Sequence, residues 1–213
     1  MNNHIYIFSG LGADERVFQK LDLSGLKVTF ISWIIPQKNE TIESYATRIL
    51  SQIKTPKPIL IGLSFGGIMA VEVAKQIETE KIILLASAKT KTEIPFYYRF
   101  AGFFSIHKLF PTALLKKSNF ISNWFFGAKI TFDKEILKTI LKETNPIFLT
   151  WALDKIVNWT NQTKLKNLTH IHGTADRILP IRFVKYDIKI NNGGHFMTLN
   201  KAKELSQIIK ELI

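Results

Sequence analysis

The feature that most constrains the fold is the alternation of short, uniformly apolar segments with longer amphipathic ones. Segments of a few apolar residues, such as 5–8 and 59–61, predict strands that are buried on both faces. Strands of that kind are typical of a mainly parallel sheet flanked by helices, so we predict an α/β fold. We expect strands at 5–8, 27–33, 59–61, 81–86, 168–172 and 184–190. We expect helices at 15–21, with Asp14 as N-cap, and at 41–53, 68–77 and 201–212.

One long stretch departs from this alternation. Residues 89–167 have a helical pattern throughout and follow the fourth expected strand, so we interpret them as a helical cap or lid inserted into the sheet domain. The chain of 213 residues is long enough for one domain with a hydrophobic core. We therefore expect a single domain, 1–213, with a core of 1–88 and 168–213 and a cap of 89–167.

The strongest local signal is Gly62-Leu63-Ser64-Phe65-Gly66, followed by Gly67. This G-x-S-x-G motif lies between an expected strand and an expected helix. A serine on a sharp strand-to-helix turn, a nucleophile elbow, projects its hydroxyl above the sheet edge, and the flanking glycines let strand and helix approach. Ser64 is the candidate nucleophile. A chance match in a tight turn is the competing interpretation.

A serine needs a base, and the base needs a carboxylate to orient it. His195 lies in Asn192-Gly193-Gly194-His195-Phe196, after the last expected strand. Asp176 lies in the segment 172–180, after the strand before it. In a parallel sheet, residues that follow strands meet at one edge, so we expect Ser64, Asp176 and His195 to lie together.

The other candidates have weaker contexts. His170 and His172 fall inside an expected strand and are interpreted as structural, and His4 and His107 have no supporting context. Asp133 and Asp154 fall in the helical insertion, and Asp187 falls inside an expected strand. A turn or cap role remains the alternative for both His195 and Asp176.

The order serine, acid, histidine, with these three motifs, resembles the α/β-hydrolase superfamily over nearly the whole chain. The resemblance implies an oxyanion hole made by the N–H groups of Phe65, the residue after the nucleophile, and Leu11, in Ser9-Gly10-Leu11-Gly12. Many relatives have His-Gly where this chain has Ser9-Gly10. Relatives also have two more N-terminal strands, so the resemblance is to a minimal version of the fold.

Composition narrows the remaining possibilities. The absence of cysteine excludes disulfides, zinc–thiolate sites and a cysteine nucleophile. Gly10-Leu11-Gly12 follows a strand, but Glu15 stands where a dinucleotide-binding G-x-G-x-x-G motif needs its last glycine. We expect no cofactor and no metal. The N-terminus has no signal-peptide pattern and no apolar run is long enough to span a bilayer, so we expect a cytoplasmic protein.

The charge is concentrated in the expected cap. Residues 89–167 hold thirteen Lys/Arg and five Asp/Glu, which is +8 of the total +12, and 15 of the 25 aromatic residues. The simplest interpretation is a cap whose aromatics pack on the core; a second is that some of them line an acyl pocket over Ser64. A third is weak contact with an anionic membrane surface. Nucleic acid is disfavoured because no binding motif accompanies the charge.

These observations predict a serine hydrolase that cleaves a small carboxylic ester or thioester with an apolar acyl group through an acyl-enzyme. A non-catalytic ligand-binding module with the same fold remains an alternative. So does a relative that acts on peptide or C–C bonds, or one that transfers acyl groups or resembles haloperoxidases. The sequence leaves the natural substrate and the oligomeric state open.

Overall fold

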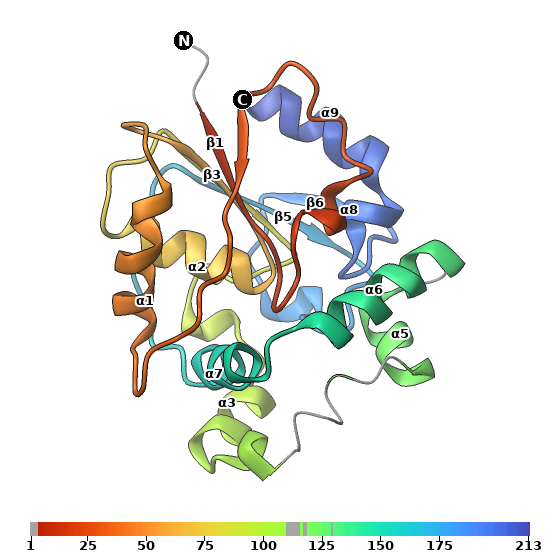
Figure 1. The fold of residues 1–213 in the computed structure, drawn as a ribbon. Helices are drawn as coiled ribbons and strands as arrows, with labels where there is room; N and C mark the ends of the chain where they lie inside the picture. The colour runs from red at the N-terminus through yellow and green to blue at the C-terminus, as the bar shows by residue number, and fades with distance from the viewer. Residues whose placement is uncertain (1–3, 110–115, 117–118, 129) are drawn as a thin grey trace.

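The computed structural model describes residues 4–109, 116, 119–128 and 130–213. Within these residues, six strands form one sheet in the order β2-β1-β3-β4-β5-β6, and every neighbouring pair is parallel (Figure 1). This confirms the predicted α/β class with a parallel sheet flanked by helices. The strands are β1 (Ile5–Phe8), β2 (Val28–Phe30), β3 (Ile59–Leu63), β4 (Lys81–Leu85), β5 (Leu168–Gly173) and β6 (Ile188–Ile190).

Both faces of the sheet are buried, as the uniformly apolar strands predicted. Successive residues of a strand point to opposite faces. In β1, Tyr6 and Phe8 belong to one hydrophobic cluster, together with α1 (Ile42–Ile49) and α2 (Phe65–Ala74). Ile5 and Ile7 belong to the other, together with α9 (Ala202–Leu212). Figure 1 shows α1 and α2 on one side of the sheet and α8 (Met197–Asn200) and α9 on the other.

The second strand is shorter than the predicted 27–33. After β2, side chains replace the strand ladder as backbone partners: Ser32 N–H donates to Gln52 Oε1, and Ile34 N–H donates to the hydroxyl of Tyr45. The expected helices 15–21 and 41–53 are also shorter. The first is the 3₁₀ turn Glu15–Phe18, capped by Asp14 as predicted. The second is α1, followed by the 3₁₀ turn Leu50–Gln52.

The prediction of a strand over 184–190 was wrong for its first four residues. A 3₁₀ turn at Ile181–Phe183 precedes extended chain, and β6 begins only at Ile188. Asp187 therefore lies before the strand and not inside it. Its Oδ2 accepts the N–H of His170 at 2.7 Å, so a side chain makes the contact that a strand backbone would make.

Between β4 and β5 the described chain is mostly helical. It forms the 3₁₀ turns Lys91–Glu93 and Ile106–Leu109 and the helices α3 (Phe96–Phe103), α5 (Phe120–Phe126), α6 (Thr131–Glu143) and α7 (Pro146–Val157). The pattern is not helical to its end, because no helix follows Val157 before β5. Residues 110–115, 117–118 and 129 of the predicted cap lie outside the described residues.

Two tryptophans fasten α7 and the chain after it to the sheet domain. Trp151 donates its Nε1–H to the backbone oxygen of Glu40 at 2.9 Å. Trp159 donates to Oε1 of the buried Glu72 in α2 at 2.8 Å, and Lys75 pairs with the other oxygen of that carboxylate. A buried charge needs such partners. These contacts fix α7 above the edge of the sheet where β3 ends.

No helix in the described part of the chain combines the length and apolar character that crossing a membrane requires.

Candidate active site

Ser64 lies on a sharp turn between β3 and α2. Its backbone has φ 54° and ψ −121°, a conformation that costs a non-glycine residue energy and persists only where the surroundings impose it. The close packing around it explains the neighbouring glycines: a Cβ at Gly62 would meet Gly66 and Gly67, and a Cβ at Gly66 would meet the backbone of Phe8 and Ser9. The predicted nucleophile elbow is thus present as geometry, with the Ser64 side chain partly exposed.

The structure brings the three predicted side chains together in one hydrogen-bonded series. Ser64 Oγ lies 2.8 Å from His195 Nε2, and His195 Nδ1 lies 2.8 Å from Asp176 Oδ2. Because a carboxylate only accepts, Nδ1 carries the proton and Nε2 is free to accept the Ser64 hydroxyl proton. Each residue follows a strand: Ser64 directly after β3, Asp176 after β5 and His195 after β6.

Asp176 is nearly fully buried, at 4% exposure, and is held as a carboxylate by its turn. The backbone N–H groups of Ile178 and Leu179 both donate to its Oδ1 at 2.9 Å, which leaves Oδ2 for His195. Burial acts to raise the pKa of the Asp176 carboxyl. The electrostatic attraction and hydrogen bond of His195 outweigh it, so the pKa of the Asp176 carboxyl lies below its usual value.

His195 sits in a turn between β6 and α8 that is braced from two sides. A Cβ at Gly173 would collide with Gly193, so the turns that carry Asp176 and His195 pack backbone against backbone. From the other side, the ring of Phe126 in α5 meets the imidazole edge-on at 5.8 Å, and Phe126 O accepts the N–H of Phe196 at 3.1 Å. The imidazole, at 3% exposure, therefore has little freedom to rotate.

Two further histidines, His170 and His172 of β5, lie behind Asp176, and the sequence interpretation did not anticipate this contact. His172 Nε2 is 2.8 Å from Leu179 O and 3.7 Å from Asp176 Oδ2. His172 Nδ1 faces His170 Nε2 at 3.2 Å, and His170 Nδ1 faces Lys185 O at 3.3 Å. Alternate residues of a strand share a face, so the spacing of His170 and His172 was the available signal.

Counting protons fixes the state of this pair. Three contacts each need one proton: the contact with Leu179 O, the contact with Lys185 O, and the contact between His172 Nδ1 and His170 Nε2. Carbonyl oxygens only accept, so all three protons must come from the rings, whereas two neutral imidazoles carry two. Burial lowers the pKa of His170 to about 3 and also lowers the pKa of His172, so both rings are neutral at pH 7. We assign the missing proton to the longest of the three contacts, the one between His170 Nδ1 and Lys185 O at 3.3 Å. His172 then donates to Leu179 O and steadies the turn that holds Asp176.

The two predicted oxyanion donors both belong to segments that adjoin Ser64. Phe65 is the first residue of α2, so its N–H has no acceptor within the helix and lies at the positive end of the helix dipole. Leu11 follows β1 in a loop that touches the turn: a Cβ at Gly10 would lie 3.7 Å from Ser64 Cβ. Leu11 lines a larger cavity and Phe65 a smaller one, and Ser64 and His195 border both.

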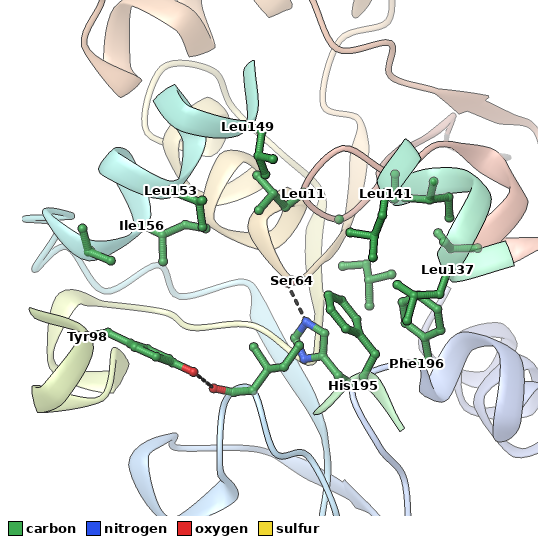
Figure 2. Close-up of a pocket in the computed structure, with 18 residues that line it drawn as sticks. Leu11, Ser64, Tyr98, Leu137, Leu141, Leu149, Leu153, Ile156, His195 and Phe196 are labelled. Atoms are coloured by element: carbon green, nitrogen blue, oxygen red, sulfur yellow. Dashed lines mark hydrogen bonds between the residues drawn. The ribbon is translucent and has the colours of Figure 1, made fainter. Parts of the chain in front are cut away.

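The larger cavity has a volume of about 320 Å³ and lies between the sheet edge and the helices that follow β4 (Figure 2). Figure 2 shows Leu149, Leu153 and Ile156 of α7 along one wall and Leu137 and Leu141 of α6 along another. Within the described residues, its lining contains no Lys, Arg, Asp or Glu. The smaller cavity, about 70 Å³, is also lined mainly by apolar side chains. The site is therefore suited to an apolar group beside Ser64.

Tyr98 lines both cavities and connects α3 to the turn that holds Asp176. Its hydroxyl donates to Ile178 O at 3.0 Å (Figure 2). Burial raises the pKa of the Tyr98 hydroxyl to about 12, so it stays protonated and keeps this hydrogen bond at neutral pH. In the described part of the chain, His, Asp and Glu side chains nowhere group in threes as metal ligands would.

Comparison with known proteins identifies the fold. No protein-family model matches the sequence, and no curated protein matches it. Solved structures do. A bromoperoxidase from Bacillus anthracis aligns with a TM-score of 0.71 at 15% identity, over 100% of this chain and 92% of its own. A thermophilic esterase from Thermogutta terrifontis aligns at 0.71 and 16%, over 98% and 88%. An enzyme described as degrading N-acyl homoserine lactones aligns at 0.71 and 15%, over 100% and 94%.

The chain has the α/β-hydrolase fold. This confirms the resemblance drawn from Gly62–Gly67, 172–180 and 193–196 as far as fold is concerned. The α/β-hydrolase fold also accounts for the chain order of Ser64, Asp176 and His195, since each follows a strand at the same edge of the sheet. At 15–16% sequence identity, structural similarity shows the fold alone.

Proposed function

We propose that the protein is a serine hydrolase that cleaves a carboxylic ester or thioester with an apolar acyl group. The observation that carries the proposal is the series Asp176–His195–Ser64 at the border of an apolar cavity. Three groups in these roles can activate a serine, and the described residues that line the cavity include no other nucleophile–base pair. The helices between β4 and β5 act, in this proposal, as the cap that encloses the substrate.

The geometry suggests the course of the reaction. His195 Nε2 accepts the Ser64 proton as Oγ attacks the carbonyl carbon, and Asp176 stabilises the imidazolium through Nδ1–H. The N–H groups of Phe65 and Leu11 donate to the oxyanion. Each such donor typically contributes about 3 kcal/mol to lowering the barrier. The imidazolium then protonates the leaving alcohol or thiol, and water releases the acid from Ser64 by the same steps.

The two cavities support an assignment of substrate parts. In this assignment the carbonyl group of the substrate lies beside Ser64, where the two cavities meet. Leu11 lines the larger cavity and Phe65 lines the smaller one. The acyl chain occupies the larger, uncharged cavity. An N-acyl homoserine lactone, the substrate class in one neighbour's description, combines a cyclic ester with an acyl chain and deserves inclusion in a substrate screen.

Hydrolysis of p-nitrophenyl esters of increasing acyl length tests the proposal. The expected result is turnover that Ser64→Ala and His195→Asn each reduce by at least about a thousandfold. Ser51→Ala, at an exposed serine beyond α1, is the matched control and keeps wild-type activity. No turnover of any ester, together with tight binding of a small molecule, would support the ligand-binding alternative.

A further inference from the structure

Two helices beside the cavity present large aromatic side chains to solvent. In α3 and the residue after it, Phe100, Phe103 and Phe104 are 59%, 80% and 57% exposed. In α5, Phe120 and Trp124 are 83% and 48% exposed, and a spacing of four places them on one face of the helix. Contiguous exposed apolar surface of this kind marks an interaction site.

Arginines join the two helices into one surface. The guanidinium of Arg177 lies over the Trp124 ring, 4.3 Å from its centroid, and Arg177 also donates to Trp124 O. A shallow groove leads from there to Arg182, whose guanidinium lies 5.0 Å from the Phe183 ring. Phe183 in turn contacts Tyr97 of α3, with ring centroids 5.8 Å apart. We call this surface the aromatic–arginine belt; it comprises Phe96, Tyr97, Phe100, Phe103, Phe104, Phe120, Trp124, Phe125, Arg177, Arg182 and Phe183.

The two sequence segments that carry the belt contain charges of one sign only. Residues 94–132, which include α3 and α5, contain five Lys/Arg, twelve aromatic residues and no Asp or Glu. Residues 177–186 add Arg177, Arg182 and Lys185, again without an acid. Of the four acids that flank these segments in the sequence, Glu93, Asp133 and Asp176 are buried, and Asp187 is paired with Lys89. A negatively charged partner complements this surface.

The same helices also contribute to the wall of the larger cavity. Tyr98 of α3 and Phe126 of α5 line it, while their neighbours Phe100 and Trp124 face outward. An apolar molecule held at the belt is thus one helix thickness from the cavity. Exposed rings interspersed with arginines, and no acid, are the composition of surfaces that sit in the headgroup region of anionic bilayers. We propose that the aromatic–arginine belt docks the protein onto an anionic lipid surface.

Docking does not depend on the proposed hydrolysis. Co-sedimentation of the full chain with vesicles tests docking directly. We expect binding to vesicles that contain phosphatidylglycerol, much weaker binding to pure phosphatidylcholine, and loss of binding as salt rises. Ser64→Ala is expected to bind as the wild type does, which separates docking from catalysis.

Matched variants locate the docking surface. Arg182→Ala is expected to weaken binding to the anionic vesicles about fivefold, the effect of one cation near such a surface. Phe103→Ser combined with Phe120→Ser, at two highly exposed rings, is expected to weaken it further. Lys203→Ala and Ile213→Ser remove a cation and an apolar side chain in α9 and at the C-terminus, away from α3 and α5 (Figure 1), and keep wild-type binding.

Several outcomes would overturn the proposal. Equal binding to both kinds of vesicle, binding to neither, or equal losses in belt and control variants would each refute it. So would light scattering that shows a dimer which Phe103→Ser disrupts, because the belt would then be a contact between two copies. Hydrolysis of a short soluble ester should be unchanged in Phe103→Ser and Arg182→Ala. Vesicle binding without any esterase activity would leave docking standing and refute the proposed function alone.

Discussion

Leu153→Trp tests the assignment of the larger cavity to the acyl chain. Liquid water occupies about 30 Å³ per molecule, so a cavity of about 320 Å³ holds about ten groups of that size. Each methylene buried there contributes about 0.8 kcal/mol, a factor of about four in kcat/KM. For the wild type we expect kcat/KM to rise by up to this factor for each added carbon until the acyl chain has about ten carbons, which fill the cavity, and then to level off.

Leu153 points into the cavity from α7, so a larger ring at this position fills part of the space (Figure 2). We expect the rise in kcat/KM to end several carbons earlier in the variant. Four methylenes lost from the cavity correspond to a decrease of about two hundredfold for a decanoyl ester, with little change for an acetyl or butyryl ester. Initial rates for a series of p-nitrophenyl esters provide the assay.

Ile147→Trp is the matched control, because Ile147 is on the same helix but 60% exposed. It should keep the wild-type profile, and equal unfolding temperatures for the two variants would show that both fold. An unchanged chain-length profile in Leu153→Trp, or the same loss at every chain length, would refute the assignment of this cavity to the acyl group.

Three further changes test the surroundings of the site. Burial lowers the pKa of His170 to about 3, so between about pH 3 and about pH 6.5 the unfolded chain binds more protons than the folded chain. The free energy of unfolding should therefore fall by about 2 kcal/mol on going from pH 7 to about pH 5. His170→Gln should flatten this slope in urea unfolding, and a slope equal to that of the wild type would contradict the prediction. His172→Phe keeps a ring but removes the donor to Leu179 O, and should lower kcat about tenfold with KM nearly unchanged; a rise in KM alone would argue against a positioning role. Gly66→Ala places a Cβ against the backbone of Phe8 and Ser9 and should lower the free energy of unfolding by at least about 1–3 kcal/mol. Gly10→Ala has room for its Cβ and should lower it less. Equal stabilities of the two variants in thermal unfolding would show that the turn tolerates the change at Gly66.

Local patterns predicted the parts of the site that depend on local structure. An apolar run, a G-x-S-x-G turn and a helix placed Ser64 at a strand end, and the same argument placed Asp176 and His195. Parallel strands meet at one edge, so three turns far apart in the sequence could be brought together without a structure. Their roles in catalysis remain predictions.

Contacts between side chains distant in sequence could not be predicted. Gln52 and Tyr45 take over the backbone partners that would have extended β2, and no pattern in 27–33 reveals this. His172 was interpreted as structural, but its contact with Leu179 O in the turn that holds Asp176 could not be predicted. Which face of α5 would meet His195 depends on how the helices pack, and so the division between cavity wall and exposed belt appears only in three dimensions.

Covalent labelling of the active serine tests the central claim most directly. A fluorophosphonate probe reacts with a serine only when a base activates its hydroxyl. We predict stoichiometric labelling of the wild type, with the modified peptide located at Ser64 by mass spectrometry. Ser64→Ala should not be labelled, and His195→Asn should be labelled far more slowly. Labelling that persists in Ser64→Ala, or a wild type that does not react although it is folded, would contradict the account.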